Sequence, residues 1–503
     1  MSAIASDPVP MRPSPGLPLR RNLRRAPLLA ACLLGALLTP TQLPASELPN
    51  LGDPSATALS PQEDYRLGQA FMRNLRQNVD IIDDPEINSY INSLGYRLLA
   101  AAGTDLPFHF FVIDDPTINA FAGPGGHIGI HSGLILAAES EGELAAVVAH
   151  EIAHVTQRHL ARAFQKASAS QLQTAAAIIA AILLGSPQLT TAMITTAAAG
   201  SIQQQLNFTR SHEREADRVG MDILVNSGFD PDNMPAFFQR LQEAYRYMES
   251  SLPELLRTHP VTPNRIADSQ NRANQYPKRG EQLSDSFPFI QAKLRAGKPQ
   301  QHQQRLKELE AKQAQSQTLS PAERYEYALF QLRRGDLEQA QGLSQALLSE
   351  APEADEFIAL QAQIEMERGQ YAEARQRLQQ ALRLYPHDPQ LSVLYADALL
   401  QTDTPKLAAD TLRDLIQHSR QFTLPSYYRL LAKAESAAGR QASAYMAMAD
   451  YYHLIGQTRT AIDQLETALQ HSDNAFHTER IKAQLAILKR AALAEQNNEA
   501  ETP

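Results

Sequence analysis

The pentapeptide His150-Glu151-Ile152-Ala153-His154 constrains this chain more than any other feature. Residues four apart share a helix face, so a helix here brings the two imidazoles to one point. Such a pair suits Zn²⁺, which binds histidine nitrogen at about 2.0–2.1 Å. Glu151 lies beside the first histidine, where its carboxylate can accept a proton from water at the metal. The pattern predicts a zinc hydrolase. The alternative is an ordinary helix that carries these residues by chance. His159 is five residues past His154, off this face, and is expected to be a solvated or helix-end residue.

A catalytic zinc site usually has three protein ligands and one open position. Metzincins take a third histidine ten residues after the first, with a glycine at the seventh place. Leu160 and Gln157 occupy these places, which excludes that class. In the other arrangement, the third protein ligand is a glutamate on a later helix. The charged stretch Ser211–Arg218 offers Glu213 as the best candidate and Glu215 as the second.

The spacing of the two motifs resembles a known family. His-Glu-x-x-His followed by Glu-x-x-Ala-Asp, here Glu213 to Asp217, resembles the gluzincins that include the CAAX prenyl protease and the HtpX heat-shock protease. The resemblance covers roughly residues 60–270. It implies that Glu213 is the third zinc ligand and that Asp217 orients a zinc-bound histidine.

A stretch before the zinc motif alternates between apolar and polar residues. His127, Ile128, Gly129 and Ile130 predict a half-exposed strand, and this stretch is similar to the edge strand of the gluzincins named above. A free strand edge beside a protease site can pair with an extended substrate. We therefore expect a substrate edge strand here. The alternative is a hairpin that only supports the helix.

The C-terminal half repeats with a period of 34 residues. A small or turn-forming residue is followed five places later by alanine, and the spacing stays at 34 or 36 residues before a last match half a period on. The pairs are Gly335 and Ala340, Gly369 and Ala374, Asp403 and Ala408, Gly439 and Ala444, and Gly456 and Ala461. This period predicts an α-solenoid of tetratricopeptide repeats, which offers a concave binding surface.

The N-terminal residues have the pattern of an export signal. Basic residues at Arg20–Arg25 precede the apolar run Ala26–Leu38, which is too short to span a bilayer. A signal peptide cleaved after Ala45 is expected, and an uncleaved membrane anchor is the alternative. Residues 171–201 are rich in alanine and threonine and predict a helical hairpin, which could be a lid over the active site, could touch a membrane surface peripherally, or could be part of the core.

These patterns predict a mainly α chain with a small β-sheet in a zincin-like catalytic domain, followed by the solenoid. The expected order is a signal peptide at 1–45, a linker at 46–61, the metalloprotease at 62–270, a linker at 271–318, the repeats at 319–490 and a disordered tail at 491–503. The net charge of −9 argues against nucleic-acid binding. Cys32 is the only cysteine, so any metal must bind histidine and carboxylate side chains.

An export signal, a gluzincin domain and tetratricopeptide repeats together resemble the periplasmic branch of this family that acts in outer-membrane β-barrel assembly. The resemblance implies one Zn²⁺ per subunit. It also implies a metalloendopeptidase that degrades misassembled barrels, assists their assembly and contacts the assembly machinery through its repeats. His259 in a His-Pro segment, with Arg265 beside it, would be a fourth ligand that blocks the zinc. The rival interpretations are a repeat scaffold with a vestigial zinc domain and a signal-anchored membrane protease.

Overall fold

The computed structural model describes residues 59–163, 210–245, 254–279, 286–298, 300–419, 423–472 and 474–500. The expected signal peptide, nearly all of the linker that follows it, and the alanine-rich segment 171–201 lie outside these residues. Within the described ranges, no helix combines the length and the apolar character needed to cross a membrane.

The catalytic domain is built around helix α5 (Glu141–Thr156), which carries the two histidines of the zinc motif. The side chain of Ser140 caps the helix by accepting a hydrogen bond from the Glu143 amide at 3.3 Å. Every residue from Gly142 to His154 is buried. Helix α5 is thus covered on all sides, and its polar residues are enclosed as well.

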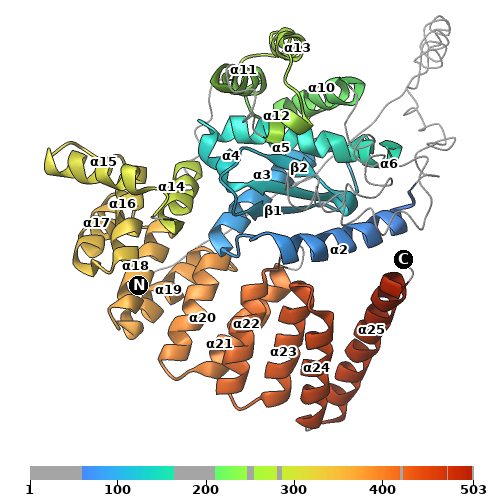
Figure 1. Cartoon of the computed structure of the whole chain (residues 1–503). Coiled ribbons are helices and arrows are strands. Elements are labelled where there is room, and N and C mark those ends of the chain that lie inside the picture. The colour runs from blue at the N-terminus through green and yellow to red at the C-terminus, as the bar shows by residue number, and fades with distance from the viewer. Residues whose placement is uncertain are drawn as a thin grey trace, which may run out of the picture. The chain divides into compact units, whose positions relative to one another are not determined.

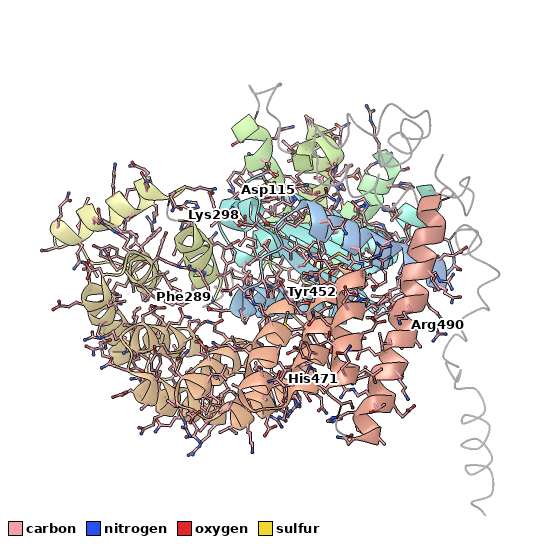
Figure 2. The ribbon with its side chains drawn as sticks, turned by 60° about the horizontal axis from the view of Figure 1, so that its bottom comes forward. Asp115, Phe289, Lys298, Tyr452, His471 and Arg490 are labelled. Atoms are coloured by element: carbon pink, nitrogen blue, oxygen red, sulfur yellow. The ribbon has the colours of Figure 1, made fainter. Side chains whose placement is uncertain are left out.

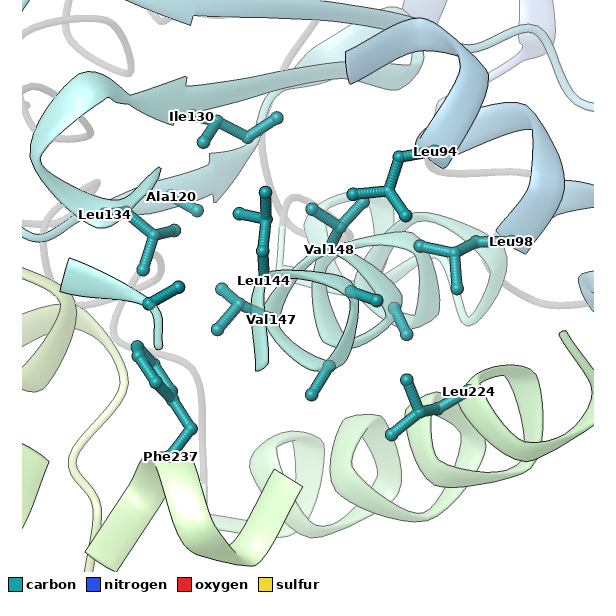
Figure 3. Packing of buried hydrophobic residues seen from close by; sticks show 14 of the residues in the cluster. Leu94, Leu98, Ala120, Ile130, Leu134, Leu144, Val147, Val148, Leu224 and Phe237 are labelled. Atoms are coloured by element: carbon teal, nitrogen blue, oxygen red, sulfur yellow. The ribbon is translucent and has the colours of Figure 1, made fainter. Parts of the chain in front are cut away.

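Several elements pack around α5 (Figure 3). Leu144, Val147 and Val148 form the α5 side of this core. The opposing side chains labelled in the figure are Leu94 and Leu98 from α3 (Pro85–Ala102), Ala120 and Ile130 from the sheet, Leu134 from α4 (Ser132–Ala137), Leu224 from α10 (Arg210–Asn226) and Phe237 from α11 (Asn233–Tyr245). Helices α2 (Pro61–Asn78), α6 (His159–Ala163), α12 (Glu254–Thr258) and α13 (Pro263–Ala273) complete the domain.

Helices α5 and α10 cross in direct backbone contact. A Cβ atom added to Gly220 of α10 would lie 3.1 Å from both the Cα and the backbone nitrogen of His150. A side chain at this position would push the two backbones apart, so glycine favours the close approach, which places the first turn of α10 beside the zinc motif.

The sheet has three strands in the order β1-β3-β2 (Figure 1). Strand β3 (His127–His131) pairs in parallel with β1 (His109–Ile113) and antiparallel with β2 (Ala120–Ala122). Both of its edges are therefore occupied, and the prediction that His127, Ile128, Gly129 and Ile130 form a substrate edge strand is wrong.

The alternating pattern of β3 is misleading because its histidines are buried. His127 Nδ1 lies 2.9 Å from the carbonyl oxygen of Pro124, and His131 Nδ1 lies 2.8 Å from the hydroxyl of Thr117. Polar partners supplied by neighbouring loops let these side chains leave water, so alternation here does not mark a solvent-facing side.

The expected linker at 271–318 is largely helical. It contains α14 (Phe287–Gly297) and α15 (Gln303–Ala314). Phe287 and Ile290 of α14 join the catalytic core, whereas Ala292 and Ala296 join the core of the first repeat. Figure 2 labels Phe289 of the same helix, whose ring meets those of Tyr325 and Phe357 at 5.3 Å. Helix α14 is thus shared between two hydrophobic cores. The sequence did not indicate this, because the residues around the helix are mostly polar.

The repeat domain consists of paired antiparallel helices (Figure 1). Its helices are α16 (Pro321–Arg334), α17 (Leu337–Glu350), α18 (Asp355–Glu367), α19 (Tyr371–Leu384), α20 (Pro389–Gln401), α21 (Pro405–His418), α22 (Pro425–Ala437), α23 (Gln441–Leu454), α24 (Thr458–Gln470) and α25 (Ala475–Ala500). The four repeat glycines have positive φ, and Asp403 takes the same conformation at φ 51°. The five repeat alanines are buried. The solenoid prediction is confirmed. Helix α25 runs on to Ala500 and so includes residues 491–500 of the stretch that the sequence predicts to be a disordered tail. Alanine and glutamate are abundant in this stretch and favour a helix.

Candidate metal centre

Helix α5 turns the two histidines of the motif toward one point, as their spacing predicts. His150 Nε2 and His154 Nε2 lie 3.0 Å apart, and both side chains are almost completely buried. Two imidazole nitrogens that face each other without water are an unfavourable arrangement unless a proton or a cation lies between them.

Glu213 reaches the same point from the first turn of α10. Its carboxylate oxygens lie 3.6 Å from His150 Nε2 and 3.6 Å from His154 Nε2. Ligands at about 2.0–2.2 Å in a tetrahedral site are separated by roughly 3.3–3.6 Å. The two Glu213 distances lie in this range and the two histidine nitrogens are slightly closer, so a small shift of the side chains would let all three hold one metal ion through the nitrogen and oxygen donors that such sites use.

His259 completes this group of donors. It follows α12, is 3% exposed, and has a ligand atom within 4.8 Å of those of His150, His154 and Glu213. Its Nδ1 lies 3.0 Å from Glu213 Oε1, and its Nε2 lies 3.8 Å from Glu151 Oε1. The loop thus brings a third histidine, the fourth donor residue of the group, against both Glu213 and Glu151.

A second carboxylate lies behind the first histidine. Asp217 Oδ1 is 3.1 Å from His150 Nδ1, one helical turn after Glu213 on α10. Arg265 of α13 donates two hydrogen bonds to Asp217, each 2.7 Å long, and also lies 2.8 Å from Glu213 Oε2. The buried guanidinium compensates the two carboxylates and joins α13 to α10.

The buried charges shift the pKa values of the site. Burial raises the pKa of Asp217, but the hydrogen bonds from Arg265 and His150 outweigh this and lower it. Burial lowers the pKa of His150, but Asp217 and Glu213 outweigh burial and raise it to about 10. For Glu213, burial is again outweighed, mainly by the neighbouring His259, and its pKa lies well below the usual value. The cluster therefore favours cationic partners beside ionised carboxylates.

Glu151 has two unused oxygens at the centre of the site. Its side chain is fully buried, and within the described residues neither carboxylate oxygen accepts a hydrogen bond. A buried carboxylate costs free energy unless a partner pairs with it. Glu151 is consequently suited to bind the proton of a water molecule or a substrate group that enters the site.

The sequence prediction missed one part of the site. His159 is completely buried, and its Nδ1 lies 2.9 Å from His154 Nδ1, so the expectation of a solvated side chain is wrong, whereas the position at a helix end holds because His159 is the first residue of α6. Glu215 lies behind it, with Oε2 3.1 Å from His159 Nε2. Glu215 is therefore turned away from the metal point, whereas Glu213 faces it. No periodicity in the sequence could have shown this, because the chain changes direction between His154 and His159.

Comparison with known proteins agrees with this geometry. Residues 85–273 match peptidase family M48, and residues 365–434 match the tetratricopeptide repeat. The chain is 36% identical over 457 residues to the beta-barrel assembly-enhancing protease of Escherichia coli K12, which covers 90% of this chain and 92% of that protein. The protein of the same name from Yersinia pestis is 34% identical, over 85% of this chain and 88% of that protein. A putative beta-barrel assembly-enhancing protease of Vibrio cholerae is 42% identical over 254 residues, which are 50% of this chain and 52% of that protein.

The M48 match spans the helix that carries the His-Glu-x-x-His motif and the helix that carries Glu213, and the repeat match lies within the solenoid. A metallopeptidase domain and a repeat domain are thus both present along one chain, in the same order as the fold shows. The chain is a metalloendopeptidase that belongs to the beta-barrel assembly-enhancing protease group of peptidase family M48.

Proposed function

We propose that this protein is a periplasmic zinc metalloendopeptidase that degrades misassembled β-barrel proteins of the outer membrane and assists their assembly. The observation that carries the catalytic part is the convergence of His150, His154 and Glu213 beside Glu151, whose oxygens have no hydrogen-bond partner in the described chain. The names of the relatives support the part that concerns barrel assembly.

His150, His154 and Glu213 would hold the Zn²⁺. When bound, this ion supplies a Lewis acid that favours attack of water on a peptide carbonyl. Glu151 accepts the proton of the attacking water and delivers it to the leaving amine, a role that its buried carboxylate can take because neither oxygen accepts a hydrogen bond from the described residues. Asp217 orients His150 through its Nδ1, and Arg265 holds Asp217 in place.

A cavity beside His154 would receive the substrate. A cavity of about 180 Å³ is lined by His154, by Ala122 of β2, by Gly123 and by Arg158. Apolar atoms from Leu106 and other residues dominate its walls, as expected for a pocket that receives an unfolded chain. The repeat domain would contribute client and assembly-machinery binding through its solenoid surface.

His259 keeps the enzyme latent in this proposal. It lies against Glu213 and close to Glu151, so it occupies space that water and substrate need. As a fourth zinc ligand it would close the open coordination position that hydrolysis requires. Movement of the loop that carries His259 would then activate the enzyme.

The decisive experiment measures zinc content and cleavage of an unfolded outer-membrane protein by the purified full chain. Glu151→Gln should keep zinc and lose at least about 100-fold in rate, because it removes only the proton acceptor. Glu213→Ala should lose zinc, and His259→Ala should keep zinc and cleave faster. Glu141→Gln, on the same helix but hydrogen-bonded to Tyr90, serves as the matched control and should change neither. Undiminished cleavage by Glu151→Gln would refute the catalytic proposal and favour a repeat scaffold.

A further inference from the structure

The Nδ1 atom of His154, on the side of the ring away from the metal point, contacts another histidine. Its Nε2 faces His150 and Glu213, and its Nδ1 lies 2.9 Å from Nδ1 of His159. The other histidine of the motif differs, because His150 Nδ1 faces the carboxylate of Asp217 at 3.1 Å. The two candidate ligands are therefore supported by different chemical groups.

A break in the helix brings His159 to this position. Helix α5 ends at Thr156, and Arg158 adopts a left-handed conformation with φ 53°. This conformation is uncommon for a residue other than glycine. Arg158 is held there by a 2.7 Å hydrogen bond to the carbonyl oxygen of Leu59, and α6 starts immediately afterwards at His159. On a continuous helix, His159 would point well away from His154.

The contact between the two rings requires a defined arrangement of protons. A neutral imidazole carries one N–H, so a His154 that binds metal through Nε2 must carry its proton on Nδ1. That proton can be donated to Nδ1 of His159 only if His159 carries its own proton on Nε2. His159 Nε2 in turn lies 3.1 Å from Glu215 Oε2, which can accept it. Every donor in this chain of contacts then has an acceptor.

The neighbours of His159 hold its ring in this orientation. Arg162 lies 3.0 Å from Glu215 Oε2 and keeps the carboxylate in place. His212 stacks on the ring of His159, with centroids 4.4 Å apart and an angle of 16° between the planes. Since His159 is completely buried, its ring has little freedom to turn away.

We propose that His159 is a positioning residue of the metal centre, which accepts the Nδ1 proton of His154 and so fixes the tautomer that exposes Nε2 to the metal. Glu215 and Arg162 orient His159 in turn. The inference rests on the proposed metal site, but it concerns metal affinity and makes no use of the cleavage reaction. Outer partners of metal-bound histidines contribute about 10- to 100-fold in affinity in comparable sites.

Two replacements of His159 separate this role from packing. His159→Leu fills similar volume without an acceptor, whereas His159→Asn places an amide oxygen close to the position of Nδ1. Zinc affinity is measured on the full chain by competition with a chromogenic chelator, and the unfolding temperature is measured in EDTA. We expect about 10- to 100-fold weaker zinc binding for His159→Leu and a change below about threefold for His159→Asn.

The buried His131, which contacts Thr117 far from the metal point, provides the control. His131→Asn should lower the unfolding temperature without weakening zinc binding. Zinc affinity of His159→Leu within threefold of the unmodified chain overturns the inference, as does an equal loss in His159→Asn. If the unmodified chain itself binds no zinc, the proposed metal site fails instead, and the two failures are distinguishable.

Discussion

Replacing Arg265 of α13 by methionine should strongly lower the free energy of unfolding of the catalytic domain. Arg265 is 5% exposed. Its guanidinium donates two 2.7 Å hydrogen bonds to Asp217, lies 2.8 Å from Glu213 and donates a 3.0 Å hydrogen bond to the carbonyl oxygen of Pro260. It also lies over the ring of Phe238 at 5.2 Å. Methionine preserves much of the apolar contact but leaves two buried carboxylates short of a cation.

The expected loss follows from these uncompensated charges. Removal of one partner from a buried ion pair typically costs about 3–5 kcal/mol, mostly because the remaining charge stays buried. For a domain of this size, each kcal/mol of lost stability lowers the unfolding temperature by about 2–4 °C. The unfolding temperature of the catalytic domain should therefore fall by about 10 °C. The double variant Asp217→Asn with Arg265→Met should recover more than half of this loss, because it removes one of the stranded charges.

Differential scanning calorimetry in EDTA measures this effect without a contribution from bound metal. The chain contains no tryptophan, so calorimetry is also preferable to intrinsic tryptophan fluorescence. Arg218→Met is the matched control, because Arg218 is an exposed residue of α10 that lies 3.9 Å from Asp222. Such a surface pair is worth less than about 0.5 kcal/mol. A loss below about 1 kcal/mol for Arg265→Met, or no recovery in the double variant, would refute the charge-compensation argument.

Two further predictions concern a helix crossing and a buried carboxyl. Gly220→Val should destabilise the catalytic domain by about 1–3 kcal/mol in urea unfolding, because its side chain would enter the backbone of α5 at His150, whereas Gly342→Ala, with open space around it on α17, should stabilise by up to about 1 kcal/mol. Equal effects at the two glycines would show that close approach of α5 and α10 is not the constraint. Burial raises the pKa of Asp450 to about 6. The folded state therefore binds a proton that the unfolded state releases near pH 4, and stability should fall by about 2 kcal/mol as the pH rises from 4 to 7. Asp450→Asn should lack this part of the pH dependence, and identical pH profiles for the two chains would contradict the assignment.

Local patterns in the sequence were sufficient to predict those features that depend on interactions between residues close together in the chain. The four-residue spacing of His150 and His154 places both on one helix face whatever surrounds the helix. The 34-residue period predicted the solenoid for a similar reason, since each repeat packs mainly on the next one and carries its own turn and buried alanine. The order of catalytic domain and repeats also follows from the sequence.

Other features were decided by contacts between segments that are distant in sequence or separated by a change of chain direction. The strand β3 reads as half exposed, yet two neighbouring strands and the Pro124 carbonyl enclose it. The polar region after residue 271 reads as a linker, yet α14 is divided between two hydrophobic cores. Periodicity reports which face of an element is apolar, but not how many partners cover it.

The metal centre also combines features that the local sequence determines with features that only tertiary contacts determine. The sequence determined by itself that a helix would present two imidazoles and a glutamate at one point, because helix geometry is a local property. It ranked Glu213 before Glu215 as the third ligand without excluding the second, and it expected His159 to be solvated or at a helix end. Only the tertiary structure separated these roles. The crossing of α10 over α5 at Gly220 sets which carboxylate faces inward, and the left-handed turn at Arg158 returns His159 to the back of His154. Both depend on how close two backbones can approach and where a helix breaks, and neither is encoded in the spacing of a motif.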